Sequence, residues 1–215
     1  MSEIFTNWIL LTGIFTLALA SPGPDFVIAV RNSISFSRVA GLFTAIGFAL
    51  GVAVHATYTL FGLATLIAQS VLLFSLIRYA GAAYLFYIGI QSLRSKGFDE
   101  KDTKLNEKRQ QTITPLQCLW SGFLTNLLNP KATLFFLAIF SQFINADTSI
   151  LVQAFYGGTC VVLTGFWFSV VAVVLTQERV KAAFLKATKW IDKVCGVLLI
   201  ALSFKLAFTK AVTTS

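Results

Sequence analysis

The chain contains little charge and almost none of the motifs from which soluble enzyme sites are built. Only 12% of its 215 residues are Asp, Glu, Lys or Arg, whereas a soluble domain carries about 25%. It has one histidine and three isolated cysteines, with no CxxC pair. The sequence also lacks a phosphate-binding loop, an HExxH motif and a nucleophile elbow. We therefore expect no enzyme, no cofactor and no metal or disulfide site.

Hydrophobic residues, in contrast, make up 56% of the chain. A membrane-spanning helix needs about 20 apolar residues in a row. Residues 8–20 resemble the core of a signal peptide, but Glu3 and the absence of Lys or Arg before them favour a retained first helix. We predict an all-α integral membrane protein with six transmembrane helices. The predicted spans cover about residues 4–30, 40–66, 72–93, 116–144, 150–176 and 190–209.

The basic residues indicate how these spans are oriented. The net charge is +8, and most Lys and Arg residues fall in the first, third and fifth loops, which should therefore face the cytoplasm. The third loop, about residues 95–114, is polar, and we expect it to be a solvent-exposed connection between the third and fourth spans. Both termini would then lie on the outer side of the membrane. This topology explains the positive charge, so we do not predict nucleic-acid binding.

The two halves of the chain look like a duplication within one transmembrane domain that covers residues 1–215. Repeat 1 covers about 1–94 and repeat 2 about 115–215, and Pro24-Asp25 aligns with Pro130-Lys131. A repeat of three spans must insert in opposite orientations, which gives an inverted repeat. The alternative is that short matches of proline and glycine arise by chance.

The first predicted span is interrupted by Ser21-Pro22-Gly23-Pro24-Asp25. Pro22 and Pro24 lack the N–H group that continues a helix, and Gly23 permits backbone torsions that other residues avoid. A charge at membrane depth costs roughly 2.5 to 3.5 kcal/mol, so Asp25 is a candidate for substrate binding and proton coupling. The alternative is a structural kink in which Asp25 caps the following helix.

The fourth predicted span is interrupted in the same way by Asn129-Pro130-Lys131. Asn129 can cap the restarted helix through its side-chain oxygen. Lys131 would pair with Asp25, hold a substrate carboxylate or extend to a membrane interface. It lies roughly 22 Å from either end of the segment at 1.5 Å per residue, which disfavours the interface. Asn126 would line the same cavity or bond a neighbouring helix.

His55, the only histidine, falls in the second predicted span. It is the second candidate for carrying a coupled proton, after Asp25, or else a hydrogen-bonded packing residue. Six glycines in the first half suit close contact between helices. They are Gly41, Gly47, Gly51, Gly62, Gly81 and Gly89.

Several motifs, in this order and over nearly the whole chain, resemble the LysE family of amino-acid exporters. They are Pro22-Gly23-Pro24-Asp25, the run from Gly41 through Gly47 and Gly51 to His55, Gly81-Ala82-Ala83-Tyr84-Leu85 with Gly89, and Asn129-Pro130-Lys131-Ala132 with Phe135-Phe136 and Gln142-Phe143. The match is closer to the homoserine, threonine and leucine exporters (the RhtB branch) than to the lysine exporters. The resemblance implies a bacterial inner-membrane exporter of amino acids or their derivatives, with six helices and driven by the proton motive force. In such a membrane, the outward termini expected from the charge pattern would lie in the periplasm. It maps the family's charged motif residues onto Asp25 and Lys131.

Together these patterns predict a site near the membrane midplane, between the two broken helices, around which the halves rock in alternating access. The expected partners are a small amino acid, protons and the lipid bilayer, and the resemblance allows a homodimer. One alternative is export of a metal or another small ion, for which one intramembrane carboxylate and one histidine offer few ligands. The other is a membrane protein that transports nothing. The sequence does not identify the amino acid.

Overall fold

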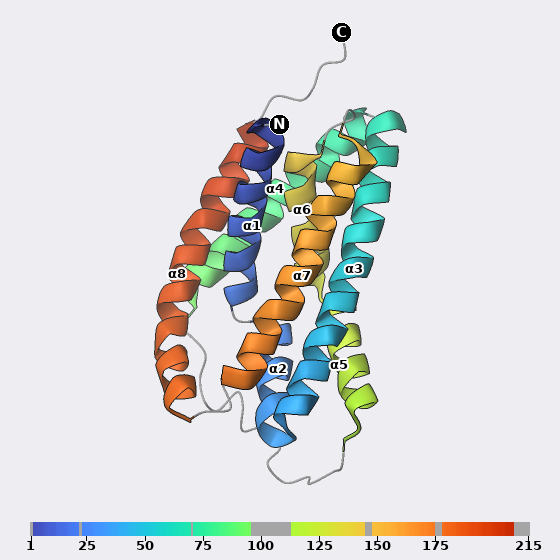
Figure 1. Cartoon of the computed structure of the whole chain (residues 1–215). Coiled ribbons are helices and arrows are strands. Elements are labelled where there is room, and N and C mark those ends of the chain that lie inside the picture. The colour runs from blue at the N-terminus through green and yellow to red at the C-terminus, as the bar shows by residue number, and fades with distance from the viewer. Residues whose placement is uncertain are drawn as a thin grey trace.

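The computed structural model describes residues 2–21, 23–69, 71–95, 113–144, 148–174 and 178–208. Within these ranges it contains eight α-helices and no strand (Figure 1), so the predicted all-α class is confirmed. The helices are α1 (Ser2–Ala20), α2 (Pro24–Ser35), α3 (Arg38–Gln69), α4 (Val71–Arg94), α5 (Pro115–Leu127), α6 (Pro130–Phe143), α7 (Ile150–Val174) and α8 (Glu178–Phe208). Most of the predicted third loop lies outside the described residues.

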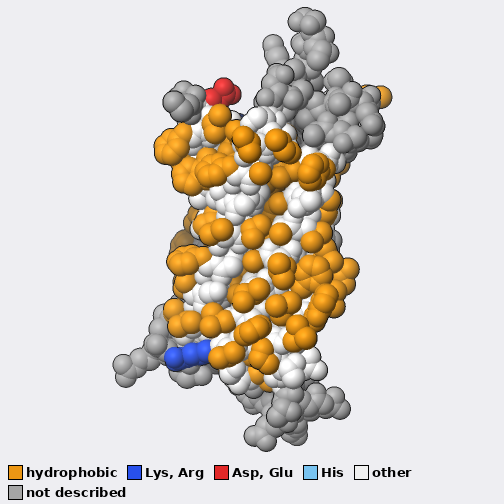
Figure 2. Space-filling model, turned by 45° about the vertical axis from the view of Figure 1, so that its right-hand side comes forward, with side chains coloured by type: hydrophobic (Ala, Val, Ile, Leu, Met, Phe, Trp, Pro, Cys, Tyr) orange, Lys and Arg blue, Asp and Glu red, His pale blue; other side chains and the backbone are white. Residues whose placement is uncertain are grey.

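Three of these helices are long and apolar enough to cross a membrane, over Glu3–Ala20, Arg38–Gly62 and Ile150–Val174. The bent pair of α5 and α6 makes a fourth if it counts as one span. Hydrophobic side chains cover much of the visible face between the two ends of the bundle (Figure 2). The protein is therefore a multi-pass membrane protein, while the arrangement of six spans in two repeats stays a prediction.

Both predicted helix breaks are present. α1 ends at Ala20 and α2 begins at Pro24, although Pro22 itself lies outside the described residues. α5 ends at Leu127, α6 begins at Pro130, and the two helices meet at an angle of 57°. Proline explains the second break, because Pro130 has no N–H to donate to the carbonyl of Asn126, four residues earlier.

α8 begins at Glu178, well before the sixth predicted span. Residues 178–189 are rich in Lys and Ala, which favour helix without adding a continuous apolar run. The hydropathy of the sequence marks a membrane-spanning segment and so misses this polar first part of the helix.

The apolar interior is divided into two cores. The large core contains buried residues of α1, α3, α4, α6, α7 and α8. The small core consists of Phe26, Ala29, Val30, Ala45, Phe48, Phe168 and Val171, from α2, α3 and α7. In Figure 1, α2 and α5 lie toward the end of the bundle opposite the two termini. The α1–α2 break therefore joins a segment of the large core to a segment of the small one.

Glycines bring several helices into backbone contact, as predicted. A methyl group added to Gly47 of α3 would meet the backbone of Leu119 and, at 2.7 Å, the nitrogen of Phe123 in α5. Gly89 of α4 faces Gly196 of α8, where the added carbon would lie 2.9 Å from the Gly196 carbonyl. Gly41, Gly51 and Gly81 are similarly crowded. At Gly62, an added Cβ would have no described atom within 4 Å, so the structure shows no close helix contact there.

Gly47→Ala is expected to lower the apparent melting temperature of the purified protein by about 5 °C. The added methyl group meets backbone atoms that cannot rotate away, and overpacking of this kind costs about 1 to 3 kcal/mol. Gly62→Ala, in the same helix, is the matched control and should not destabilise the protein. Size-exclusion chromatography after heating measures both variants. Equal melting temperatures would contradict the close α3–α5 contact.

Candidate functional site

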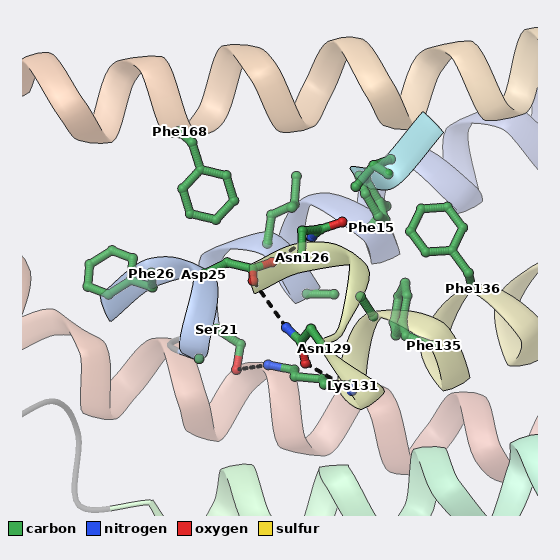
Figure 3. Close-up of a pocket in the computed structure, with 15 residues that line it drawn as sticks. Phe15, Ser21, Asp25, Phe26, Asn126, Asn129, Lys131, Phe135, Phe136 and Phe168 are labelled. Carbon is green, nitrogen blue, oxygen red and sulfur yellow. Dashed lines mark hydrogen bonds between the residues drawn. The ribbon is translucent and has the colours of Figure 1, made fainter. Parts of the chain in front are cut away.

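The two helix breaks meet at a small cavity, which we call the Asp25 cavity (Figure 3). Its volume is about 60 Å³. Its polar lining consists of Ser21, Asp25, Asn126, Asn129 and Lys131. Phenylalanine rings supply much of the apolar wall, namely Phe15, Phe26, Phe135, Phe136 and Phe168. Four predicted site residues thus reach the same cavity, namely Asp25 from the first half of the sequence and Asn126, Asn129 and Lys131 from the second.

Both carboxylate oxygens of Asp25 accept hydrogen bonds from the other half of the chain. The side-chain amide of Asn126 donates to Oδ2 at 2.7 Å, and that of Asn129 donates to Oδ1 at 3.2 Å. Asp25 is the second residue of α2, yet its oxygens contact α5 and the α5–α6 break. These bonds do not fit the alternative in which Asp25 caps its own helix. Asn126 both lines the cavity and bonds a neighbouring helix.

His55 lies behind the second break rather than in the lining of the cavity. Its Nε2 is 3.0 Å from the carbonyl oxygen of Asn126, the group that Pro130 leaves without a helical donor. The backbone N–H of Asn129 also donates to this carbonyl, at 3.0 Å. Because a carbonyl only accepts, Nε2 carries the hydrogen and Nδ1 accepts from the Tyr58 hydroxyl at 2.6 Å. These bonds favour the packing alternative for His55.

His55→Phe is expected to slow export about tenfold without changing its dependence on pH. The phenyl ring keeps the stacking on Phe136 but removes the donor to the Asn126 carbonyl, so Asn126 holds Asp25 less firmly. The loss corresponds to one hydrogen bond of about 1 to 1.5 kcal/mol. Rates measured across a pH series test this. A shifted or flattened pH profile would instead identify His55 as a proton carrier.

Lys131 directs its ammonium group toward the cavity. Nζ donates to the hydroxyl of Ser21 at 3.3 Å, across the gap between the two breaks (Figure 3). Its backbone N–H donates to the side-chain oxygen of Asn129 at 3.0 Å, which confirms the predicted cap of α6. The structure thus places the Lys131 ammonium on Ser21, in the lining of the cavity, and without a hydrogen bond to Asp25.

Gly23 has an extended backbone and lies beside the side chain of Lys131. Its φ of −165° and ψ of −172° are extended values that any residue adopts, so the predicted torsional role was wrong. An added Cβ would lie 3.7 Å from Nζ of Lys131, which is an ordinary van der Waals contact. Glycine thus leaves room beside the ammonium group.

Asp192 of α8 is a functional candidate that the sequence analysis missed. Its side chain is only 3% exposed. The Ser21 hydroxyl donates to its Oδ1 at 3.3 Å, and the Ser95 hydroxyl donates to its Oδ2 at 2.6 Å. Ser21 therefore accepts from Lys131 and donates to Asp192. The flanking Lys189 and Lys193 made Asp192 resemble an interface residue.

A usable signal for Asp192 was nevertheless in the sequence. Asp192 shares one helix face with Cys195, Gly196 and Leu199, at the three- and four-residue spacing of a buried stripe, and all four are buried.

The three cysteines are free and buried. Among the described residues, no three His, Cys, Asp or Glu side chains come close enough to hold a metal ion together.

Comparisons with known proteins show which family the chain resembles. The family model described as "LysE type translocator" matches residues 16–210. Among similar proteins, the membrane protein YahN of Escherichia coli K12 is 30% identical, over 93% of this chain and 88% of its own length. The threonine efflux protein of the same strain is 29% identical, over 90% and 94%. The Bacillus subtilis membrane protein YrhP is also 29% identical, over 86% and 90%. No solved structure matches the chain.

Proposed function

Because the chain belongs to the LysE type translocator family, we propose that it exports small amino acids or their derivatives, of the threonine, homoserine and leucine type. Membership confirms the resemblance read from the motifs and makes the protein a membrane transporter, not an enzyme. The threonine efflux proteins, which are similar over about nine tenths of this chain, support the substrate class. We assign the protein to the bacterial inner membrane, with six spans and both termini in the periplasm.

The observation that carries the proposal is the charge arrangement at the two breaks. Asp25 and Lys131 line the same cavity without a hydrogen bond to each other, and each is held by neutral partners instead. An amino acid carries one carboxylate and one ammonium group. Lys131 would bind the carboxylate and Asp25 the ammonium, while the phenylalanine wall contacts the side chain. Charge-assisted bonds of this kind are about twice as strong as neutral ones.

Transport requires the cavity to widen. Its 60 Å³ holds a few water molecules, so a bound amino acid needs the two breaks to separate. The helix breaks suit this movement, since neither the α1–α2 nor the α5–α6 junction is a continuous helix. We propose alternating access in which the site opens to each side in turn. Close backbone contacts of α3 with α5 and of α4 with α8 join the two halves of the sequence. These contacts argue against a movement in which residues 1–94 rock as one rigid body against residues 115–215.

A proton gradient would drive export through Asp25. This carboxylate binds either the substrate ammonium or a proton, so release of substrate on the outer side allows protonation, and proton release on the inner side restores the site. Such mutual exclusion gives exchange of protons for amino acid.

The decisive experiment is efflux from proteoliposomes loaded with labelled threonine, homoserine, leucine and lysine, with and without a pH gradient. We expect gradient-dependent efflux of threonine or its close relatives, abolished by a protonophore. A parallel set of vesicles loaded with labelled divalent cations tests the ion alternative. If folded protein releases none of the amino acids, the proposal fails.

A further inference from the structure

A second cavity lies on the other side of Lys131. We call it the Asp192 cleft, and its volume is about 520 Å³. It shares Ser21, Gly23, Asn129 and Lys131 with the Asp25 cavity. To these it adds Asp192 and a polar wall that includes Tyr87 and Gln91 of α4 and Ser95 directly after it. Lys131 is therefore part of the boundary between a small, largely apolar cavity and a larger, more polar cleft.

The Asp192 cleft has one acid and one base in its lining, and one hydroxyl group connects them. Lys131 donates to Ser21, and Ser21 donates to Asp192. The two charged groups are thus held near each other by a neutral group and not by direct contact. A zwitterion that displaced the hydroxyl would satisfy both, with its carboxylate on Lys131 and its ammonium on Asp192.

The charges of the whole region point the same way. Two carboxylates, Asp25 and Asp192, face one ammonium group in the combined lining of the two cavities. When both are ionised, one negative charge is in excess. A buried charge without a partner is costly. An amino acid leaves the net charge unchanged, but its ammonium group gives either carboxylate a positive partner while its own carboxylate pairs with Lys131.

We propose that the Asp192 cleft is a loading site for α-amino acids, which rests on the export function proposed above. The substrate carboxylate stays on Lys131, which lines both cavities, while the ammonium moves from Asp192 to Asp25. The cleft is the larger of the two and accepts an amino acid without widening. Its wall includes the last residues of α4, next to the third loop that the charge pattern assigns to the cytoplasm, from which an exporter takes its substrate.

The test is equilibrium binding of labelled L-threonine to purified protein in detergent, with Asp192→Asn. We expect the Kd for threonine to rise about tenfold or more, as for a lost charge-assisted hydrogen bond. 3-Hydroxybutyrate, which is threonine without its amino group, serves as a competitor. Its inhibition constant should differ less than twofold between the wild type and Asp192→Asn. If the efflux panel identifies leucine instead, leucine and 4-methylpentanoate replace this pair. Glu3→Gln, an exposed acid at the far end of α1, is the matched control.

The outcomes separate this inference from the proposed function. Unchanged threonine binding by Asp192→Asn, in a protein whose wild type exports threonine, overturns the loading site alone. Equal weakening of threonine and 3-hydroxybutyrate also overturns it, because Asp192 would then only support the structure. A wild type that neither binds nor exports any amino acid overturns the proposed function itself.

Discussion

Lys131→Met is expected to reduce gradient-driven efflux at least about 100-fold. Among the residues that the structure describes, Lys131 is the only cationic one in the linings of the Asp25 cavity and the Asp192 cleft. Methionine keeps most of the apolar stem but cannot bind the substrate carboxylate in either place. The loss of a charged hydrogen bond, about 1.5 to 3 kcal/mol, together with the unbalanced charge of two carboxylates, accounts for this magnitude.

The same change should also destabilise the fold, so loss of activity has to be separated from loss of protein. Removing one partner from a buried charged group costs about 3 to 5 kcal/mol. Lys131→Met combined with Asp25→Asn restores the original balance of one excess negative charge. We expect the double variant to recover much of the melting temperature but none of the efflux. Efflux by either folded variant at the wild-type rate would remove Lys131 from the site.

Asp25→Asn is expected to abolish pH-driven efflux, again by at least about 100-fold, while leaving the protein folded. The new amide group would face the donor of Asn126 or Asn129. The Asn126 side chain can rotate to compensate, because its Oδ1 is buried and has no hydrogen-bond partner. The hydrogen bonds therefore survive, and what is lost is the negative charge that binds the ammonium or the proton.

Efflux with an imposed pH gradient and exchange of labelled for unlabelled substrate without one should both be measured for Asp25→Asn. Loss of both fits a carboxylate that binds substrate and proton in turn. Loss of gradient-driven efflux with intact exchange would assign Asp25 to proton coupling alone. Unimpaired gradient-driven efflux would exclude Asp25 from coupling. A melting temperature within a few degrees of wild type shows that the comparison is valid.

The sequence predicted those parts of the site that depend on local chemistry. Proline cannot donate a backbone hydrogen bond, so the breaks before Pro24 and Pro130 follow from the chain alone. Charge is costly at membrane depth, so Asp25 and Lys131 stood out against their apolar surroundings. The cap by Asn129 is a contact between near neighbours in the chain and was predicted for the same reason.

The parts that the sequence did not reveal depend on contacts between distant segments. Ser21 is 171 positions from Asp192, and only the folded bundle shows that its hydroxyl connects this acid to Lys131. His55 looked like a proton carrier because it is rare and ionisable. Its bond to a carbonyl 71 positions away indicates a supporting role instead. Hydropathy also could not show that α8 continues beyond the membrane-spanning segment.

The unequal size of the two cores has a consequence for the energetics of the transport cycle. Toward α2, the Asp25 cavity is closed by only the few side chains of the small core, where the rings of Phe48 and Phe168 lie 4.6 Å apart. Toward the termini, the much larger core blocks the path. Exposing apolar surface to water costs about 25 cal/mol per Å². Separating the side chains of the small core therefore costs less free energy than separating those of the large core. We expect the resting protein to open spontaneously on the cytoplasmic side, and the outward-opening step to be the one that a driving force must assist.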